Sequence, residues 1–240
     1  SRVNEPFVDV DDSHWFKADV EDAYNYVLTQ GTTATTYSPY NEITRGEFVV
    51  MLARALDLQP SNNTNKLKDV DGTWYAGEVQ ALYELGIVKG NADGTFGGEN
   101  KITRQEAATF ITRMLTHMNV DVTVENTVEF IDNNDISAFA MDSVQYLATK
   151  GVLVGGGDNK FNPTNNFNNV DLPTLGNPTN PTSANSLSST LRFIFSPGSP
   201  RSQIVGAGFL EDANLALPLP PRPPLQIVAC CPSSTKSANS

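Results

Sequence analysis

The chain has 240 residues, of which 39% are hydrophobic, and a formal net charge of −11 at pH 7. This apolar content is enough for one or two packed cores and predicts a soluble, globular protein. The acidic charge argues against a nucleic-acid partner, because affinity for a phosphate backbone depends on clustered Lys and Arg side chains, and the sequence contains no such cluster.

No apolar stretch approaches the roughly 18 residues that a membrane-spanning helix needs, so we expect no membrane insertion. The chain starts at a serine with no basic and apolar leader, which predicts a fragment or a processed form. The two cysteines, Cys230 and Cys231, are adjacent and therefore cannot join distant segments of the chain.

The chain contains a near copy of itself displaced by 59 residues. The segment Ile43–Glu47 reads ITRGE, and Ile102–Glu106 reads ITRQE. Other landmarks recur upstream of each copy: Asp9 with Asp69, Trp15 with Trp74, and Tyr37 with Phe96. A recurrence on this scale covers a whole structural unit and predicts a repeat array.

Each repeat is predicted to form a helix, a loop and a second helix. Apolar residues at helical spacing predict the first helix in each copy: Val20, Ala23, Tyr24 and Val27 in one, and Val79, Leu82 and Tyr83 before Gly86 in the other. The loop that follows carries Tyr37 or Phe96, and we expect this aromatic ring to fill the core.

The second helix of each repeat is predicted to start at the repeated pentapeptide. Thr44 is placed to be the N-cap, and Glu47, three residues later, can accept a hydrogen bond from the amide of the cap. Thr103 and Glu106 repeat this capping box. Apolar stripes follow in both copies: Phe48, Met51, Leu52, Ala55 and Leu56, then Phe110, Ile111, Met114 and Leu115.

A third copy begins near Phe130 and is incomplete. Its first helix is predicted by Ala140, Val144, Leu147 and Ala148, but residues 168–171 read NNVD where the Thr-Arg-x-Glu signature is expected. We therefore predict an all-α fold with repeats at 5–58, 66–119 and 128–166.

The tail at 167–240 is rich in Pro, Ser and Asn, which predicts disorder. The tail is either a linker or a frame-shifted segment. We favour the frame shift because the similarity stops inside a motif; sequencing the coding DNA tests it.

Together these motifs resemble S-layer homology repeats. The resemblance implies three repeats around a pseudo-threefold axis, on bacterial cell-surface proteins, that anchor them non-covalently to the cell wall. It also implies an extracellular binding module without a cofactor, whose ligand is a peptidoglycan-linked secondary cell-wall polysaccharide that commonly carries pyruvate ketals. Self-association would come through a parent S-layer region. Because the third unit is defective, we predict reduced stability and at most two working grooves.

The residues give an independent reason to expect an acidic ligand. Arg45 and Arg104 stand at the first helical position, where the helix dipole disfavours a cation unless an anion joins it. A ketal carboxylate could bind the guanidinium while adjacent amides complete its shell, with Thr44 and Thr103 part of the site. The alternative is an internal ion pair with a carboxylate such as Glu42 or Glu99, which would only fix the loop.

The other expected ligand-binding residues each have a structural alternative. Trp15 and Trp74 could stack on sugars or fill the core. Asp9 and Asp69 could contact ligand or form turn hydrogen bonds. Lys89 could add positive charge near the second groove or simply be solvated. For Glu47 and Glu106, capping is the expected role.

No motif for metal or nucleophilic chemistry stands out. Counting from Asn91 places Gly94 at position four of a would-be EF-hand loop, where position six is required. Zinc is not expected, since His14 and His117 are the only histidines. Two rivals to an anchoring module remain. One is the terminal region of a larger secreted carbohydrate-active enzyme, and the other is a purely structural helical array.

Overall fold

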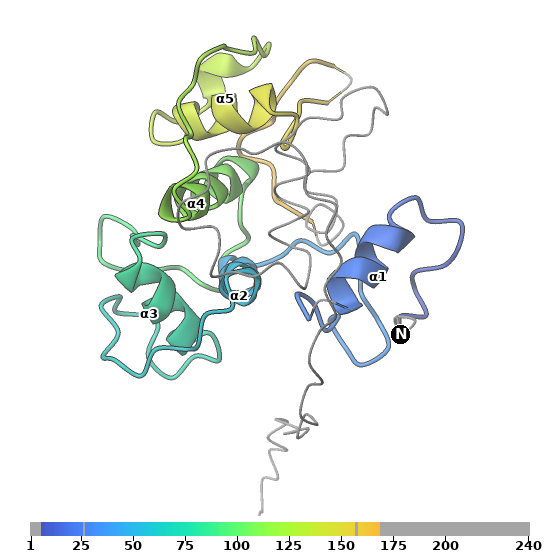
Figure 1. The fold of residues 1–240 in the computed structure, drawn as a ribbon, viewed down its shortest axis with the longest axis vertical. Coiled ribbons are helices and arrows are strands. Elements are labelled where there is room, and N and C mark those ends of the chain that lie inside the picture. The colour runs from blue at the N-terminus through green and yellow to red at the C-terminus, as the bar shows by residue number, and fades with distance from the viewer. Residues whose placement is uncertain (1–5, 26, 157, 169–240) are drawn as a thin grey trace, which may run out of the picture. The chain divides into compact units, whose positions relative to one another are not determined.

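The computed structural model describes residues 6–25, 27–156 and 158–168. These residues form helices and isolated bridges but no β-strand, so the predicted all-α class is confirmed (Figure 1). The helices are α1 (Lys17–Asn25), α2 (Arg45–Ala55), α3 (Ala76–Glu84), α4 (Arg104–His117), the 3₁₀ helix η1 (Asn133–Asp135) and α5 (Met141–Thr149). No helix within the described ranges has the length and apolar character needed to cross a membrane. The predictions of disorder and of a frame shift concern residues 167–240; Phe167 and Asn168 are described, and residues 169–240 lie outside the described ranges.

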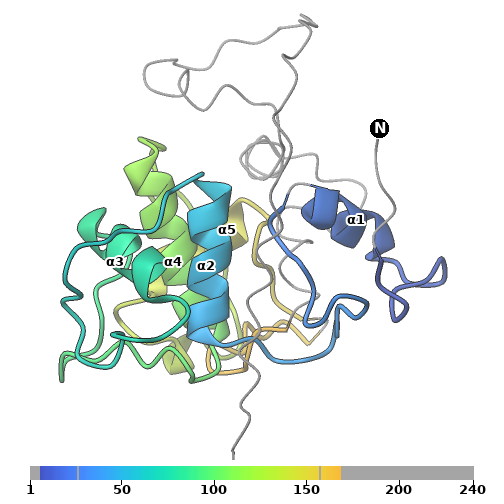
Figure 2. The same ribbon diagram turned by 90° about the horizontal axis from the view of Figure 1, so that it is seen from below.

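The most extensive contacts between helices join different repeats. Helix α3 packs on α2, α5 packs on α4, and α2 also contacts α4 (Figures 1 and 2). The first helix of each later repeat thus covers the second helix of the repeat before it. Because each helix has only one apolar stripe, this exchange buries surfaces that no single repeat could cover.

One large core draws on all three repeats. Phe48 of α2 lies 6.2 Å from Phe110 of α4 and 5.9 Å from Phe167 of the third repeat, between ring centroids. The loop aromatics Tyr37, Phe96 and Phe161 are buried, as expected for rings that fill the core. Tyr37 belongs to a separate small cluster around α1, together with Phe7, Val10, Phe16 and Val20.

Three backbone hydrogen bonds close a ring through the repeats. The Ile43 amide donates to the Phe167 carbonyl at 3.0 Å, the Phe167 amide to the Ile102 carbonyl at 2.8 Å, and the Ile102 amide to the Ile43 carbonyl at 3.1 Å. Ile43 and Ile102 each precede the N-cap of a second helix, and Phe167 is the equivalent residue of the third repeat, 65 residues after Ile102. These three hydrogen bonds relate equivalent residues of the three repeats, as a pseudo-threefold axis requires. The described part of the third repeat ends at Asn168.

Both capping boxes form as predicted. The Thr44 amide donates to Oε2 of Glu47 at 2.6 Å, and the Thr103 amide donates to Oε2 of Glu106 at 2.9 Å. Each threonine side chain accepts the amide of its glutamate in return. The second helices therefore begin where the local sequence indicates.

Helix α1 is shorter than predicted. It ends at Asn25, so Val27 lies beyond the helix, 48% exposed and with φ of 60°. The equivalent residues of the other repeats are Gly86 and Gly151, at φ of 73° and 71°. The prediction of Val27 on the apolar face is wrong because the chain leaves the helix through a left-handed turn.

Candidate functional site

The amides at the N-terminus of α2 are engaged within the protein. The Arg45 amide donates to the carbonyl of Asn100 at 2.9 Å, and the Gly46 amide donates to the carbonyl of Gly98 at 2.9 Å. The same exchange links the second and third repeats: Arg104 to Asn165 at 2.9 Å, and Gln105 to Pro163 at 3.0 Å. These amides join successive repeats, so they do not form the anion shell that was expected.

The side chain of Arg45 is buried between two aromatic rings. Its guanidinium carbon lies 5.0 Å from the centroid of Phe96 and 5.3 Å from that of Phe110. Its Nε donates to the Phe96 carbonyl at 3.0 Å, and Nη1 donates to Oε1 of Glu106 at 2.7 Å. Burial lowers the pKa of Arg45, and the charge of Glu106 acts against this shift.

The internal ion pair exists, but neither expected partner forms it. The carboxylate is that of Glu106, not that of Glu42 or Glu99. Glu106 therefore has two roles, since Oε2 caps α4 while Oε1 receives Arg45 from the preceding repeat. The expectation that capping accounts for Glu106 is incomplete, because the sequence does not show which oxygen faces another repeat.

Arg104, in the next repeat, makes contacts equivalent to those of Arg45. Its Nε donates to the Phe161 carbonyl at 2.9 Å, and its guanidinium lies 4.9 Å from the ring of Phe161. Its Nη2 donates to the Val154 carbonyl at 2.8 Å. A carbonyl and an aromatic ring of the following repeat thus hold both arginines in the same way.

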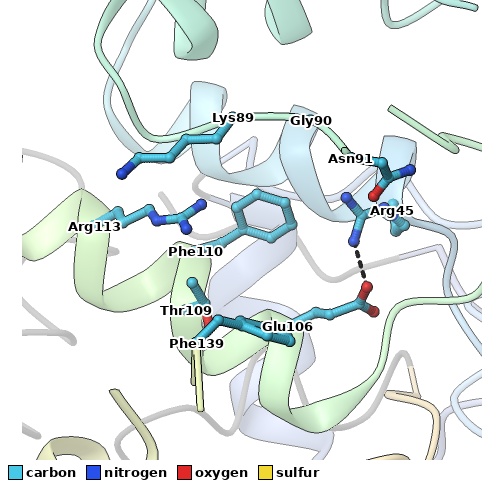
Figure 3. Close-up of a pocket in the computed structure, with 9 residues that line it drawn as sticks. All are labelled: Arg45, Lys89, Gly90, Asn91, Glu106, Thr109, Phe110, Arg113 and Phe139. Carbon is cyan, nitrogen blue, oxygen red and sulfur yellow. Dashed lines mark hydrogen bonds and ion pairs between the residues drawn. The ribbon is translucent and has the colours of Figure 1, made fainter. Parts of the chain in front are cut away.

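A cavity of about 370 Å³ brings Arg45 together with other charged and aromatic groups (Figure 3). Its lining includes Arg45, Lys89, Glu106, Phe110, Arg113 and Phe139. Figure 3 shows Lys89 and Arg113 on one side of the Phe110 ring and the Arg45–Glu106 pair on the other. Three cations face one carboxylate among these residues, so the cavity favours an anion. All three repeats contribute to it.

Arg113 is a site residue that the sequence reasoning missed. It lies on α4 seven residues after Glu106, which places both side chains on one helix face. Its Nη1 donates to the Ile87 carbonyl at 3.4 Å. Burial and then the positive charge of Arg45 lower the pKa of Arg113, so the two guanidinium groups repel each other. The helical spacing was the signal that could have found it.

The aromatic residues before the first helices are exposed rather than buried in the core. Trp15 is 63% exposed, Trp74 61% and Phe139 58%. Phe139 is the third-repeat equivalent, 65 residues after Trp74, and sequence reasoning did not identify it. The cavity includes Phe139 but neither tryptophan.

The aspartates of the repeats hold loops. Asp9 accepts the amides of Tyr37 and Ser38 at 2.8 and 2.7 Å. Asp69 accepts those of Phe96 and Gly97 at 2.6 and 2.7 Å. Asp132, which was not identified as a site residue, does the same for Phe161 and Asn162, at 2.8 and 2.7 Å. Over the described ranges, no three His, Cys, Asp or Glu side chains gather to hold a metal ion.

Comparison with known proteins identifies the repeats. The family model of the S-layer homology domain matches residues 6–49, 66–108 and 132–168. An endoglucanase of Bacillus sp. (strain KSM-635) is 36% identical over 67% of the chain, and an S-layer protein of Bacillus licheniformis is 26% identical over 71%. A cellulosome-anchoring protein of Acetivibrio thermocellus is 31% identical over 45% of the chain. The chain spans 17%, 19% and 26% of these relatives' own lengths.

Proposed function

Because the chain belongs to the S-layer homology domain family, we propose that its cavity binds an anionic secondary cell-wall polysaccharide linked to peptidoglycan. Domains of this family anchor proteins to the cell wall. The chain is thus a non-catalytic, cell-surface module, and it matches the larger enzymes only over this region, 17% of the endoglucanase.

The excess of positive charge in the cavity is the observation that carries the proposal. Lys89 is exposed, Arg113 is half-buried, and Glu106 is the one carboxylate among the lining residues. Arg45 already donates to Glu106, so Lys89 and Arg113 are the cations placed to receive a ligand carboxylate, with Arg45 adding to the positive potential. A pyruvate ketal supplies such a carboxylate, which suits a guanidinium group.

Phe139 supports a saccharide over a simple anion. Its ring is largely exposed although it borders the cavity. The C–H face of a pyranose ring is apolar, and covering an exposed aromatic ring with it removes apolar surface from water. A sugar that carries a carboxylate would thus contact both the cations and the aromatic ring of the cavity.

Lys89 of the second repeat has no cationic equivalent in the other repeats. At the position of Lys89 the first repeat has Gln30 and the third has Val154. We propose the cavity lined by Lys89 as the principal binding site and the surroundings of Arg104 as a weaker second site. We propose that the other nominated residues shape these sites and do not pair with the ligand carboxylate: Thr44, Thr103, Trp15, Trp74, Asp9 and Asp69.

The test is retention on cell-wall sacculi that carry a pyruvylated polysaccharide, before and after that polysaccharide is stripped. We expect Lys89→Gln to weaken binding by about threefold to tenfold, because it removes one exposed charge beside the ligand. Lys66→Gln is the matched control, with the same charge change in the same repeat outside the cavity. Equal retention of the unaltered chain on intact and stripped sacculi would contradict the proposal.

A second proposal concerns the whole protein to which this module belongs. The similarity to an endoglucanase, of which the chain spans 17%, favours a larger carbohydrate-active enzyme that the module anchors. A structural surface-layer protein is the competing parent, given the similarity to an S-layer protein. The coding sequence upstream decides between them: a large carboxylate-bearing domain supports the enzyme, and a Thr- and Val-rich self-assembling region supports the surface layer.

A further inference from the structure

We infer that Glu106 limits the affinity of this cavity for its ligand, because its carboxylate competes internally for Arg45. The inference rests on the proposed function, since it concerns the same anionic saccharide. It assigns Glu106 a role in selectivity beyond capping α4. A ligand must either outcompete this carboxylate or bind beside it.

Arg45 does not need Glu106 to stay in place. Its Nε is held by the Phe96 carbonyl, and its guanidinium lies between the rings of Phe96 and Phe110. The Nε and ring contacts recur at Arg104 with the carbonyl and ring of Phe161. The Phe96 carbonyl and the two rings thus hold Arg45 through contacts that do not involve Glu106.

Glu106 is likewise held without Arg45. Its Oε2 accepts the amide and the hydroxyl of Thr103, both at 2.9 Å. Glu47 makes the corresponding amide contact in the first repeat, where no side chain among the described residues donates to its Oε1. The capping box alone is thus sufficient to orient this carboxylate, and the contact between Oε1 and Arg45 follows from the packing of α2 beside α4.

A ligand in the cavity meets the carboxylate more readily than the guanidinium. The Glu106 side chain is 28% exposed, whereas that of Arg45 is 9% exposed. An anion that enters the cavity is therefore repelled by Glu106, and Nη1 of Arg45 is already occupied. Neutralising Glu106 raises the excess of positive charge among the lining residues from two to three.

The test substitutes Glu106→Gln, because glutamine is accepted at this position of a capping box. Calorimetric titration with purified pyruvylated polysaccharide should show about threefold to tenfold tighter binding than the unaltered chain, as expected for one added charge near the ligand. Glu47→Gln is the matched control, with the same charge change at the same capping position of the first repeat, and it should leave the affinity unchanged. The gain should vanish with polysaccharide from which pyruvate has been removed.

The double variant Arg45→Gln/Glu106→Gln keeps the inference testable if the single variant does not fold. It removes both members of the pair and leaves no buried cation unpaired. It should bind within twofold of the unaltered chain, since Lys89 and Arg113 still supply an excess of two charges. A tenfold loss would overturn the inference, because it would show that Glu106 does not offset the positive charge of Arg45 in the unaltered chain.

The outcomes separate the two claims. Failure of the unaltered chain to bind the pyruvylated polysaccharide defeats the proposed function. Binding by the unaltered chain, with Glu106→Gln folded and no tighter, overturns only the role assigned to Glu106. Far-ultraviolet circular dichroism at the titration temperature establishes that each variant is folded.

Discussion

Asp69 does not line the cavity, but it holds the loop that contacts Arg45. By accepting the amides of Phe96 and Gly97, it fixes the loop that presents the Phe96 carbonyl and ring to Arg45. Partial burial acts to raise the pKa of Asp69, but the two amide hydrogen bonds outweigh it, and the pKa lies below the ordinary value of 3.8. The ionised carboxylate is therefore the form that the folded loop stabilises.

We predict that Asp69→Asn lowers the unfolding free energy at pH 7 by about 1 kcal/mol, a modest value because the carboxylate is exposed to solvent. An amide offers only one acceptor atom for the two amide donors. Because the folded-state pKa is depressed, the contribution of Asp69 is present above pH 3.8 and is lost as the pH falls through the folded-state value.

Urea unfolding at pH 7 and at pH 3 measures this effect. The difference between the Asp69→Asn variant and the unaltered chain should shrink at the lower pH. Asp135→Asn is the control, since Asp135 is exposed and its carboxylate accepts no hydrogen bond from the described residues. An Asp69→Asn effect of the same size at both values of pH would show that charge is not the cause.

Val27 is the residue at which the first repeat departs from the backbone geometry of the others. A β-branched residue at φ of 60° is strained, whereas Gly86 and Gly151 adopt the same turn freely. Apolar spacing alone predicted a longer α1, because spacing does not show that the backbone turns left-handed at Val27. Val27 is 48% exposed, so its side chain gains only partial burial in return.

We predict that Val27→Gly raises the unfolding free energy by about 1 kcal/mol, because relief of the left-handed strain exceeds the entropy that glycine loses on folding. The melting temperature should rise by roughly 2–4 °C. Thermal unfolding followed by circular dichroism measures the change. Gly86→Val is the reciprocal variant and should destabilise, whereas a fall in stability for Val27→Gly would contradict the argument.

At the scale of elements, the sequence predicts most accurately what short-range contacts decide. Helices α2 and α4 begin immediately after Thr44 and Thr103, because a capping box joins residues only three apart. The apolar stripe predicted for α4 is buried, whereas that of α2 is only partly correct, because Met51 and Leu56 are half-buried and Val49, Val50 and Ala53 are buried as well. The left-handed turn at Val27 was missed because its sequence lacks the glycine that marks the other repeats.

The candidate site depends on contacts between elements, which the sequence does not reveal. Arg45 and Glu106 are 61 residues apart and meet only because α2 packs beside α4. Phe139 joins them from a third repeat. Arg45 and Lys89 could be nominated from their sequence positions, and helical spacing from Glu106 could have added Arg113, but the ion pair follows from packing.

For the molecule as a whole, the hydrogen-bond ring makes the repeats interdependent. Ile43, Ile102 and Phe167 each donate to one neighbour and accept from another, so no repeat closes its own pattern. Phe167 is also fully buried against Phe48. The third repeat therefore helps to hold the cavity, to which it contributes only Phe139 directly.

We predict that Phe167→Ala lowers the unfolding free energy by about 3–5 kcal/mol, the range for removing a large aromatic ring from a core. Because typical domains have only about 5–15 kcal/mol of stability, this loss should bring the described repeats close to unfolding together. Differential scanning calorimetry measures both the melting temperature and the number of transitions. Phe139→Ala removes an equally large ring at the surface and should change stability by no more than about 0.5 kcal/mol. If Phe167→Ala unfolded the third repeat alone and left a second transition at its original temperature, the ring would be a local contact rather than the link that makes the repeats one cooperative unit.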